Sequence, residues 1–371
     1  MKVKFKSFGF SFLVLLLLYA YSPLFQTLIT SISVLVLLAT LAWQMGPFVS
    51  RIFIKPFAKI LDTRDKAVLI TGCDSGFGHG SALLLNSMGF KVYAGCLSLD
   101  GLGPATLKSK ASQPDRMILV KMNVTSEEEI DQAYNQIVST MGANEKLWGL
   151  VNNAGIFRQG PIEMGDFDFF VREQFDVNVF AVVKVTRKFS PLIRKARGRI
   201  VVLSSLASRS SIAPLAAYCM TKHAIAAFCD CLRSEIGSAG VQVISIEPYF
   251  YNTNLINSKQ LTSFDDKCWN TTPLEMRTAF GESEYKKTMN RFSLLLKSNG
   301  IGPGQDPAEV CEAVAKALVD PEPPYRYVCS SPYLKPIFLI GAIVPREFFV
   351  ITQKRLMQRF SPTFDQAKKF E

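Results

Sequence analysis

The fold of this chain is decided by the stretch Ala67-Val68-Leu69-Ile70-Thr71-Gly72-Cys73-Asp74-Ser75-Gly76-Phe77-Gly78. Its first residues are apolar or β-branched, which favours a strand buried on both faces. Three glycines follow, and apolar residues continue beyond them at helical spacing at Leu83, Leu84, Leu85 and Met88. Glycine lets the backbone turn sharply and approach a phosphate closely, and the start of a helix offers free N–H groups to a pyrophosphate. The stretch therefore predicts a strand, a phosphate-binding turn and a helix.

Outward from this stretch, short runs without polar alternation recur along the chain. Helix signals lie between them, such as the capping box formed by Ser126 and Glu129. Strands that alternate with helices predict an α/β fold, here a Rossmann-type doubly wound parallel sheet of about seven strands. The expected strands are Lys66–Thr71, Lys91–Gly95, Met117–Met122, Trp148–Asn152, Arg199–Ser204, Gln242–Glu247 and Arg326–Cys329.

The N-terminal residues have a different composition. No charged residue occurs from Ser7 to Ser50, and this stretch holds two apolar runs, Phe8–Tyr21 and Leu24–Trp43. The second run is long enough to cross a bilayer, which takes about 20 residues. Lysines and arginines flank the apolar stretch on both sides, which favours a helical hairpin with both ends in the cytosol. A single signal anchor with the enzyme in the lumen, or a cleaved signal peptide, stays open.

These patterns predict three regions. Residues 1–60 form a membrane anchor of one or two apolar transmembrane helices, residues 61–331 form the α/β domain, and residues 332–371 form an apolar and then basic segment near the membrane. Ligands bind beyond the carboxyl ends of the strands in doubly wound sheets. The insertion at residues 249–307 is therefore expected to cover the substrate.

Charge and metal-ligating residues exclude two classes of function. The net charge is +11, but residues 1–66 carry +6 of it and residues 351–371 carry +3. Positive charge gathered beside apolar segments fits an anionic membrane lipid surface rather than nucleic acid. The chain has eight cysteines without a CxxC pair and only two histidines, so no metal site, and in particular no zinc catalysis, is expected.

A second group of residues carries chemistry. Tyr218 and Lys222 are one helical turn apart and share a helix face. A free tyrosine has a pKa of about 10, and a nearby ammonium lowers that value. Tyr218 is therefore expected to exchange a proton with a substrate oxygen near neutral pH.

Four blocks together resemble the short-chain dehydrogenase/reductase family. They are the glycine turn, Asn152-Asn153-Ala154-Gly155 at the end of a strand, Asn178, and Ser205 with Tyr218-x-x-x-Lys222. The resemblance implies a catalytic set of Asn178, Ser205, Tyr218 and Lys222. In that set Ser205 orients the substrate oxygen, Lys222 reaches the nicotinamide ribose, and Asn178 holds a water that links Lys222 to solvent.

The same resemblance implies the contacts of a nicotinamide cofactor. The expected cofactor-binding residues are Thr71, Gly72, Asp74, Ser75, Gly76, Phe77, Gly78, Asn123, Val124, Asn153, Ala154, Gly155, Tyr218, Lys222, Pro248 and Thr253. An NADP site needs a cation for the 2′-phosphate. Ser75 and the stretch Gly95–Asp100 supply none, and Asp74 would repel a phosphate, so NAD is favoured over NADP.

One position departs from the family pattern. Tyr249 follows Pro248 where the family commonly has glycine. We expect Tyr249 to narrow the pocket beside the nicotinamide, and the expected substrate-binding residues are Ser205 and Tyr249.

Within the family, the sequence is similar to retinol dehydrogenases, 17β-hydroxysteroid dehydrogenase type 2 and 3-hydroxybutyrate dehydrogenase. With the apolar anchor, this similarity implies an NAD-dependent oxidoreductase of a lipophilic alcohol, ketone or aldehyde, of the steroid or retinoid class. The expected location is the endoplasmic reticulum membrane with the catalytic domain in the cytosol, or alternatively a mitochondrial membrane, and a homo-oligomer is implied. Two other functions stay open: a small hydroxy-acid dehydrogenase, and a non-catalytic, membrane-tethered NAD-binding protein.

Overall fold

The structure is a computed structural model that describes residues 19–20, 22–53, 61–249, 251, 258–297 and 306–330. The chain divides into two units, Met1–Ile60 and Leu61–Glu371. All of the predicted catalytic and cofactor-binding residues belong to the second unit. The predicted C-terminal segment at 332–371 lies outside the described residues.

Helix α2, Pro23–Phe53, is the main described element of the first unit. The Ser22 hydroxyl accepts a hydrogen bond from the Phe25 N–H at 3.2 Å, and Pro23 occupies the first helical position, so both residues start the helix favourably. Among the described residues, no helix combines the length and apolar character needed to cross a membrane. The large aliphatic side chains that α2 exposes are Leu24, Leu28, Ile29, Ile32, Val34, Leu35, Val36 and Leu38.

The second unit contains the predicted sheet. Its seven strands are all parallel and lie in the order β3-β2-β1-β4-β5-β6-β7. The predicted strands are confirmed to within two residues at either end. The strands are β1 Lys66–Thr71, β2 Lys91–Cys96, β3 Met117–Lys121, β4 Lys146–Asn152, β5 Arg199–Leu203, β6 Gln242–Pro248 and β7 Arg326–Cys329.

Helices cover both faces of this sheet, which explains the apolar runs. Along β1, Val68 and Ile70 join one core cluster, whereas Ala67 and Leu69 join the other. Side chains of α3 and α12 pack into the first cluster, and those of α5, α7 and α8 into the second. These helices are α3 Gly76–Ser87, α5 Glu127–Thr140, α7 Ala181–Ala196, α8 Ala216–Ile236 and α12 Ala308–Val319, with α4 Leu102–Lys110 beside α3.

Local signals set where helices begin. Ser126 accepts a hydrogen bond from the Glu129 N–H at 3.2 Å, as the capping box predicts. The Glu129 carboxylate accepts from the Asn123 N–H at 2.7 Å, so it secures the loop that follows β3. Short helical turns complete the unit, at Pro114–Arg116, Asp168–Arg172, α6 Glu173–Phe175, Asp176–Phe180, Leu206–Ser208 and Gly237–Ala239.

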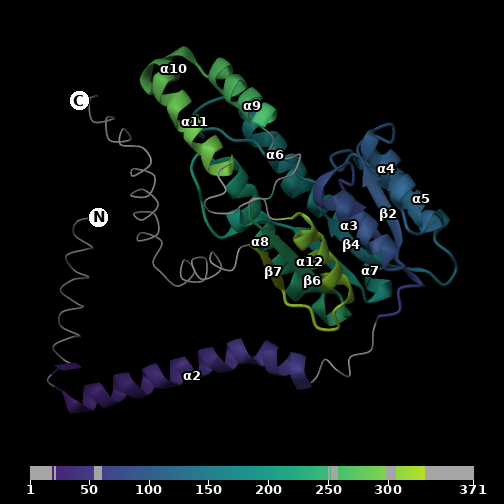
Figure 1. Cartoon of the computed structure of the whole chain (residues 1–371), viewed down its shortest axis with the longest axis horizontal. Coiled ribbons are helices and arrows are strands. Elements are labelled where there is room, and N and C mark those ends of the chain that lie inside the picture. The colour runs from purple at the N-terminus through teal and green to yellow at the C-terminus, as the bar shows by residue number, and fades with distance from the viewer. Residues whose placement is uncertain are drawn as a thin grey trace. The chain divides into compact units, whose positions relative to one another are not determined.

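The insertion between β6 and β7 forms helices α9 Ser258–Thr271, α10 Leu274–Phe280 and α11 Glu282–Lys297 (Figure 1). Its apolar side chains form a small core with Met164 and Phe170 from the segment after β4. A side-chain hydrogen bond of 2.6 Å from Gln159 to Asp265 also joins α9 to that segment. These contacts place α9 beside the residues that follow β4.

Candidate active site and cofactor cleft

The glycine turn after β1 requires glycine at particular positions. Gly72 and Gly76 have φ values of +71° and +61°, which disfavour side chains. A Cβ atom on Gly72 would lie 2.8 Å from the Ala154 Cα, and one on Gly78 would lie 2.3 Å from the Gly72 carbonyl oxygen. Glycine therefore permits β1, β4 and the start of α3 to approach closely.

Thr71 and Asn153 join the ends of β1 and β4 rather than standing free. The Thr71 hydroxyl accepts hydrogen bonds from the Asn153 and Ala154 N–H groups, each at 3.0 Å. The Asn153 amide donates to the Thr71 carbonyl at 2.8 Å and the Gly72 carbonyl at 3.0 Å. In this structure both side chains shape the turn.

A cleft of about 610 Å³ opens where the strands end. That volume is within the range of ligand sites, about 300–1,000 Å³. Its lining includes ten of the predicted cofactor-binding residues: Gly72, Asp74, Ser75, Gly76, Phe77, Asn123, Val124, Asn153, Ala154 and Gly155. The backbone at the start of α3, the glycine-only approach and the cleft size together fit a nicotinamide dinucleotide, with the pyrophosphate at the helix N-terminus.

Asp74 holds the loop that follows β2. Its carboxylate accepts hydrogen bonds from the Leu97 N–H at 3.0 Å and the Ser98 N–H at 3.4 Å. Both loop residues also line the cleft. A negative charge therefore lies at this end of the cleft.

Tyr218 and Lys222 lie together on α8. The Lys222 ammonium is 5.6 Å from the centre of the Tyr218 ring, and it donates a hydrogen bond to the Leu203 carbonyl at 3.0 Å. The Tyr218 ring packs edge-on against Phe157, with ring centres 5.1 Å apart. Since Phe157 lines the cleft, this contact places Tyr218 beside it.

The expected lowering of the Tyr218 pKa does not occur. Burial raises the pKa of Tyr218 to about 12, and a side-chain hydrogen bond with Ser205 offsets only part of that rise. Burial also lowers the pKa of Lys222 to about 8. The prediction from helical spacing was wrong because both groups lie in an apolar setting that disfavours their charged forms.

Ser205 begins the short turn after β5. Its hydroxyl accepts a hydrogen bond from the Ala207 N–H at 3.1 Å and donates to the Pro248 carbonyl at 3.4 Å. The catalytic candidates Ser205 and Tyr218 are therefore brought together, next to the end of β6.

Asn178 is buried in the π-helical turn Asp176–Phe180. Its amide accepts from the Ile156 N–H at 2.8 Å and donates to the Ile156 carbonyl at 2.9 Å and to the Thr221 hydroxyl at 3.3 Å. Asn178 thus holds the strand end next to α8, and its water-binding role stays a prediction.

Two further predicted residues, Pro248 and Tyr249, lie at the end of β6. Tyr249 is partly buried, its N–H donates to the Cys329 carbonyl at 2.9 Å, and burial raises its pKa. The described lining of the cleft includes neither Tyr249 nor Pro248, and Thr253 lies outside the described residues. The substrate-binding role of Tyr249 stays a prediction.

Sequence reasoning missed one wall of the cleft. Phe157 and Arg158 follow the Asn-Ala-Gly block at the end of β4, while Gln260 and Phe264 come from α9. The first pair could have been found, because residues just beyond parallel strands meet at one edge of the sheet. The second pair depends on long-range packing. Other lining residues outside the prediction are Leu97, Ser98, Met122, Ile156 and Val177.

Comparisons with known proteins agree with this geometry. The mitochondrial D-beta-hydroxybutyrate dehydrogenase of Bos taurus is 38% identical over 71% of this chain and 76% of its own length. Retinol dehydrogenase 16 of Mus musculus is 39% identical over 71% of this chain and 80% of its own. Estradiol 17-beta-dehydrogenase 2 of Mus musculus is 37% identical over 54% of this chain and 52% of its own.

A solved structure shares the fold. The crystal structure of a short-chain dehydrogenase from Streptomyces avermitilis superposes with a TM-score of 0.58 and 24% identity, over 79% of this chain and 97% of that one. The family model for short chain dehydrogenases matches residues 66–263, which include β1 to β6 and all four sequence blocks. The chain therefore belongs to the short-chain dehydrogenase family and is an oxidoreductase that acts on CH–OH groups.

Proposed function

We propose that this enzyme transfers a hydride between NAD and a lipophilic alcohol of the steroid or retinoid class, to give the ketone or aldehyde, and that it runs the reverse reaction. The observation that carries the proposal is that Tyr218 lies with Ser205 and Lys222 and packs against Phe157, which lines the glycine-rich cleft. The described lining itself includes none of the three, so they lie behind Phe157. These groups can bind and protonate one oxygen atom. They suit a reaction at a carbinol carbon.

A bound nicotinamide would supply the hydride acceptor in oxidation and the hydride donor in reduction. In oxidation, the hydroxyl proton would pass to Tyr218 in its ionised form, and because burial raises the pKa of Tyr218 to about 12, this step is favoured at high pH. In reduction, neutral Tyr218 returns that proton to the carbonyl oxygen. Ser205 would orient the substrate oxygen, and Lys222 would bind the cofactor's ribose.

The charge of the cleft supports NAD as the cofactor. The Asp74 carboxylate lies against the loop after β2, where an adenosine ribose would bind, and it would repel a 2′-phosphate. Among the described lining residues, the cation is Arg158, which follows β4 rather than β2.

The apolar wall supports a lipophilic substrate. Phe157, Phe264 and Ile156 line the cleft, and Tyr218 itself packs in an apolar cluster with Leu261 and Phe292. An apolar pocket with one polar anchor is typical of such substrates. Two relatives, named as a retinol and an estradiol dehydrogenase, also support a lipophilic substrate.

Arg158 favours a second candidate, a small hydroxy-acid substrate. Its guanidinium lies 3.6 Å from the centre of the Phe169 ring, and it pairs with Glu173, but its buried Nε has no hydrogen-bond partner. Arg158 also lines the cleft, so its guanidinium would offer a charge partner to a substrate carboxylate there. A hydroxybutyrate dehydrogenase is also among the relatives.

One substrate panel separates the two candidates. We expect purified full-length enzyme to oxidise retinol or estradiol with NAD at least ten times more efficiently, by kcat/KM, than 3-hydroxybutyrate, and to prefer NAD over NADP. In Arg158→Met, kcat/KM for the lipophilic alcohols should stay within about threefold of wild type, because an apolar side chain replaces the cation. If 3-hydroxybutyrate is instead the best substrate and Arg158→Met abolishes its oxidation, the second candidate holds.

We further propose that residues 1–60 anchor the α/β domain of residues 61–331 in a membrane, with residues 332–371 near its surface. The exposed aliphatic side chains of α2 and the lysines and arginines around them support an anionic, apolar partner such as the endoplasmic reticulum membrane, with a mitochondrial membrane as the alternative. Detergent-solubilised chain is expected to be a homo-oligomer by light scattering.

Asn270 provides a test of topology. It lies in an Asn-Thr-Thr sequon and is exposed on α9. If the α/β domain is cytosolic, glycosidase treatment of the protein from cells should not change its gel mobility. A glycan on Asn270 would place the domain in the lumen.

A further inference from the structure

The end of β6 carries a fully buried carboxylate that the proposed chemistry does not use. Glu247 has no exposed surface and directly precedes Pro248, whose carbonyl accepts the Ser205 hydrogen bond. A buried charge is costly unless it is paired and hydrogen-bonded. Glu247 is paired in this way, with hydrogen bonds from Arg209, Arg326 and Ser245.

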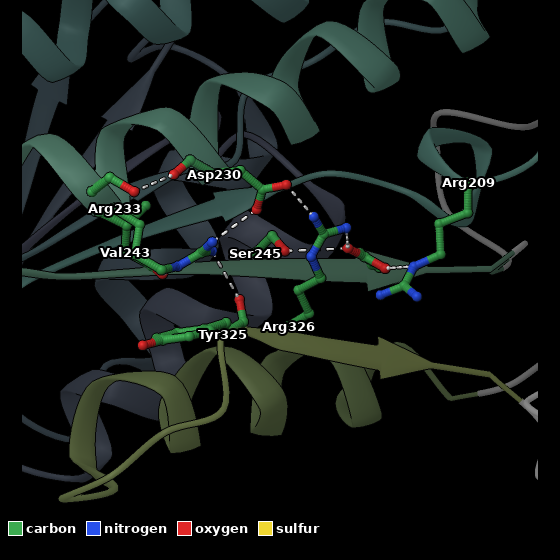
Figure 2. A network of polar contacts seen from close by, with 9 residues as sticks. Arg209, Asp230, Arg233, Val243, Ser245, Tyr325 and Arg326 are labelled. Carbon is green, nitrogen blue, oxygen red and sulfur yellow. Dashed lines mark hydrogen bonds and ion pairs between the residues drawn. The ribbon is translucent and has the colours of Figure 1, made fainter. Parts of the chain in front are cut away.

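Two arginines from different segments bind Glu247. The Arg209 Nε donates to one carboxylate oxygen. The Arg326 guanidinium and the Ser245 hydroxyl each donate to the other oxygen at 3.2 Å. Figure 2 shows Arg209 reaching this network from the turn after β5, while Arg326 continues it to Asp230.

The Arg209 contact is the third attachment of one short segment to β6. The Ser204 N–H donates to the Ile246 carbonyl at 2.8 Å, and Ser205 donates to Pro248 at 3.4 Å. Arg209 then fixes the far end of the turn that Ser205 begins. The ion pair therefore joins the far end of the turn to β6, while Ser204 and Ser205 join its start.

A buried ion pair commonly contributes little net stability compared with an apolar pair of similar size. Geometry at a reacting centre matters more, since a misplacement of about 1 Å can cost about 100-fold in rate. We propose that Glu247 and Arg209 are positioning residues that hold the Ser205 hydroxyl in register with Tyr218. The inference rests on the proposed function, because Ser205 must contact the substrate oxygen.

The test compares Arg209→Met, Glu247→Gln and the double variant with Asp230→Asn. Asp230 is a matched control because it belongs to the same network but binds Arg326 and Arg233, not the Ser205 turn (Figure 2). We expect each single variant to lower kcat about tenfold, with KM and NADH binding within about twofold of wild type. The kcat of the double variant should also fall about tenfold rather than 100-fold, because both changes break the same contact. Arg209→Lys should recover part of the loss.

Hydrogen–deuterium exchange provides a readout that needs no turnover. Backbone amides of residues 205–210 should exchange faster in Arg209→Met and Glu247→Gln, and should remain as in wild type in Asp230→Asn. Unchanged exchange in Arg209→Met, additive losses of kcat, or an equal loss in Asp230→Asn would overturn the inference. Absence of turnover in wild type, or full turnover in Ser205→Ala, would instead overturn the proposed function while the exchange result still tests the contact.

Discussion

Tyr218→Phe is expected to lower kcat by about 1,000-fold, in the range that general acid–base catalysis contributes. The change removes only the phenolic oxygen, so the ring should keep its contact with Phe157 and its place in the surrounding apolar cluster. Cofactor binding should persist, because the cleft lining is untouched. Steady-state kinetics with NAD and the best alcohol of the panel, together with NADH fluorescence titration, measure both quantities.

Tyr134→Phe is the matched control for this variant. It removes the same oxygen from α5, which supplies no described residue to the cleft. Its kcat should stay within about twofold of wild type. Wild-type turnover in Tyr218→Phe would show that another group moves the proton, and the proposed mechanism would then be wrong.

The strands and the glycine turn could be predicted from the sequence because their cause is local. A strand buried on both faces must be apolar throughout, and the close approach of Gly78 to the Gly72 carbonyl leaves no space for a side chain. The family resemblance, carried by the same motifs, implied ten residues that line the cleft. Helical spacing also placed Tyr218 and Lys222 on one helix face.

Properties that depend on tertiary packing were not predictable in this way. The spacing of Tyr218 and Lys222 says nothing about burial, and burial reverses the expected direction of the Tyr218 pKa. Phe264 reaches the cleft from an insertion more than 100 residues beyond β4, which no local pattern encodes. Glu247 and Arg209 are likewise brought together by long-range packing, which no local pattern encodes.

Lys222→Met should abolish turnover and, at the same time, stabilise the cofactor-free protein. Lys222 is buried, and its pKa falls from 10.5 to about 8. Below pH 8 the side chain is charged in both folded and unfolded protein, so folding must bury an ammonium. Between pH 8 and 10.5 the folded protein loses this proton while the unfolded chain retains it, so the unfolded state binds more protons and the contribution of Lys222 to stability rises with pH.

The methionine variant lacks this charge, so its free energy of unfolding should exceed that of wild type by the largest amount below pH 8. This difference should shrink by about 3 kcal/mol as the pH rises to 10.5, at about 1.4 kcal/mol per pKa unit. Loss of the hydrogen bond to the Leu203 carbonyl subtracts about 1 kcal/mol at every pH. Urea unfolding of the detergent-solubilised chain at pH 7 and pH 10 measures the difference. Lys316→Met, which removes an exposed lysine, is the matched control. A stability difference between wild type and Lys222→Met that does not change with pH would mean that burial does not destabilise the ammonium. The predicted trend, together with the loss of turnover, would show that the enzyme keeps an unfavourable charge at a position that the reaction requires.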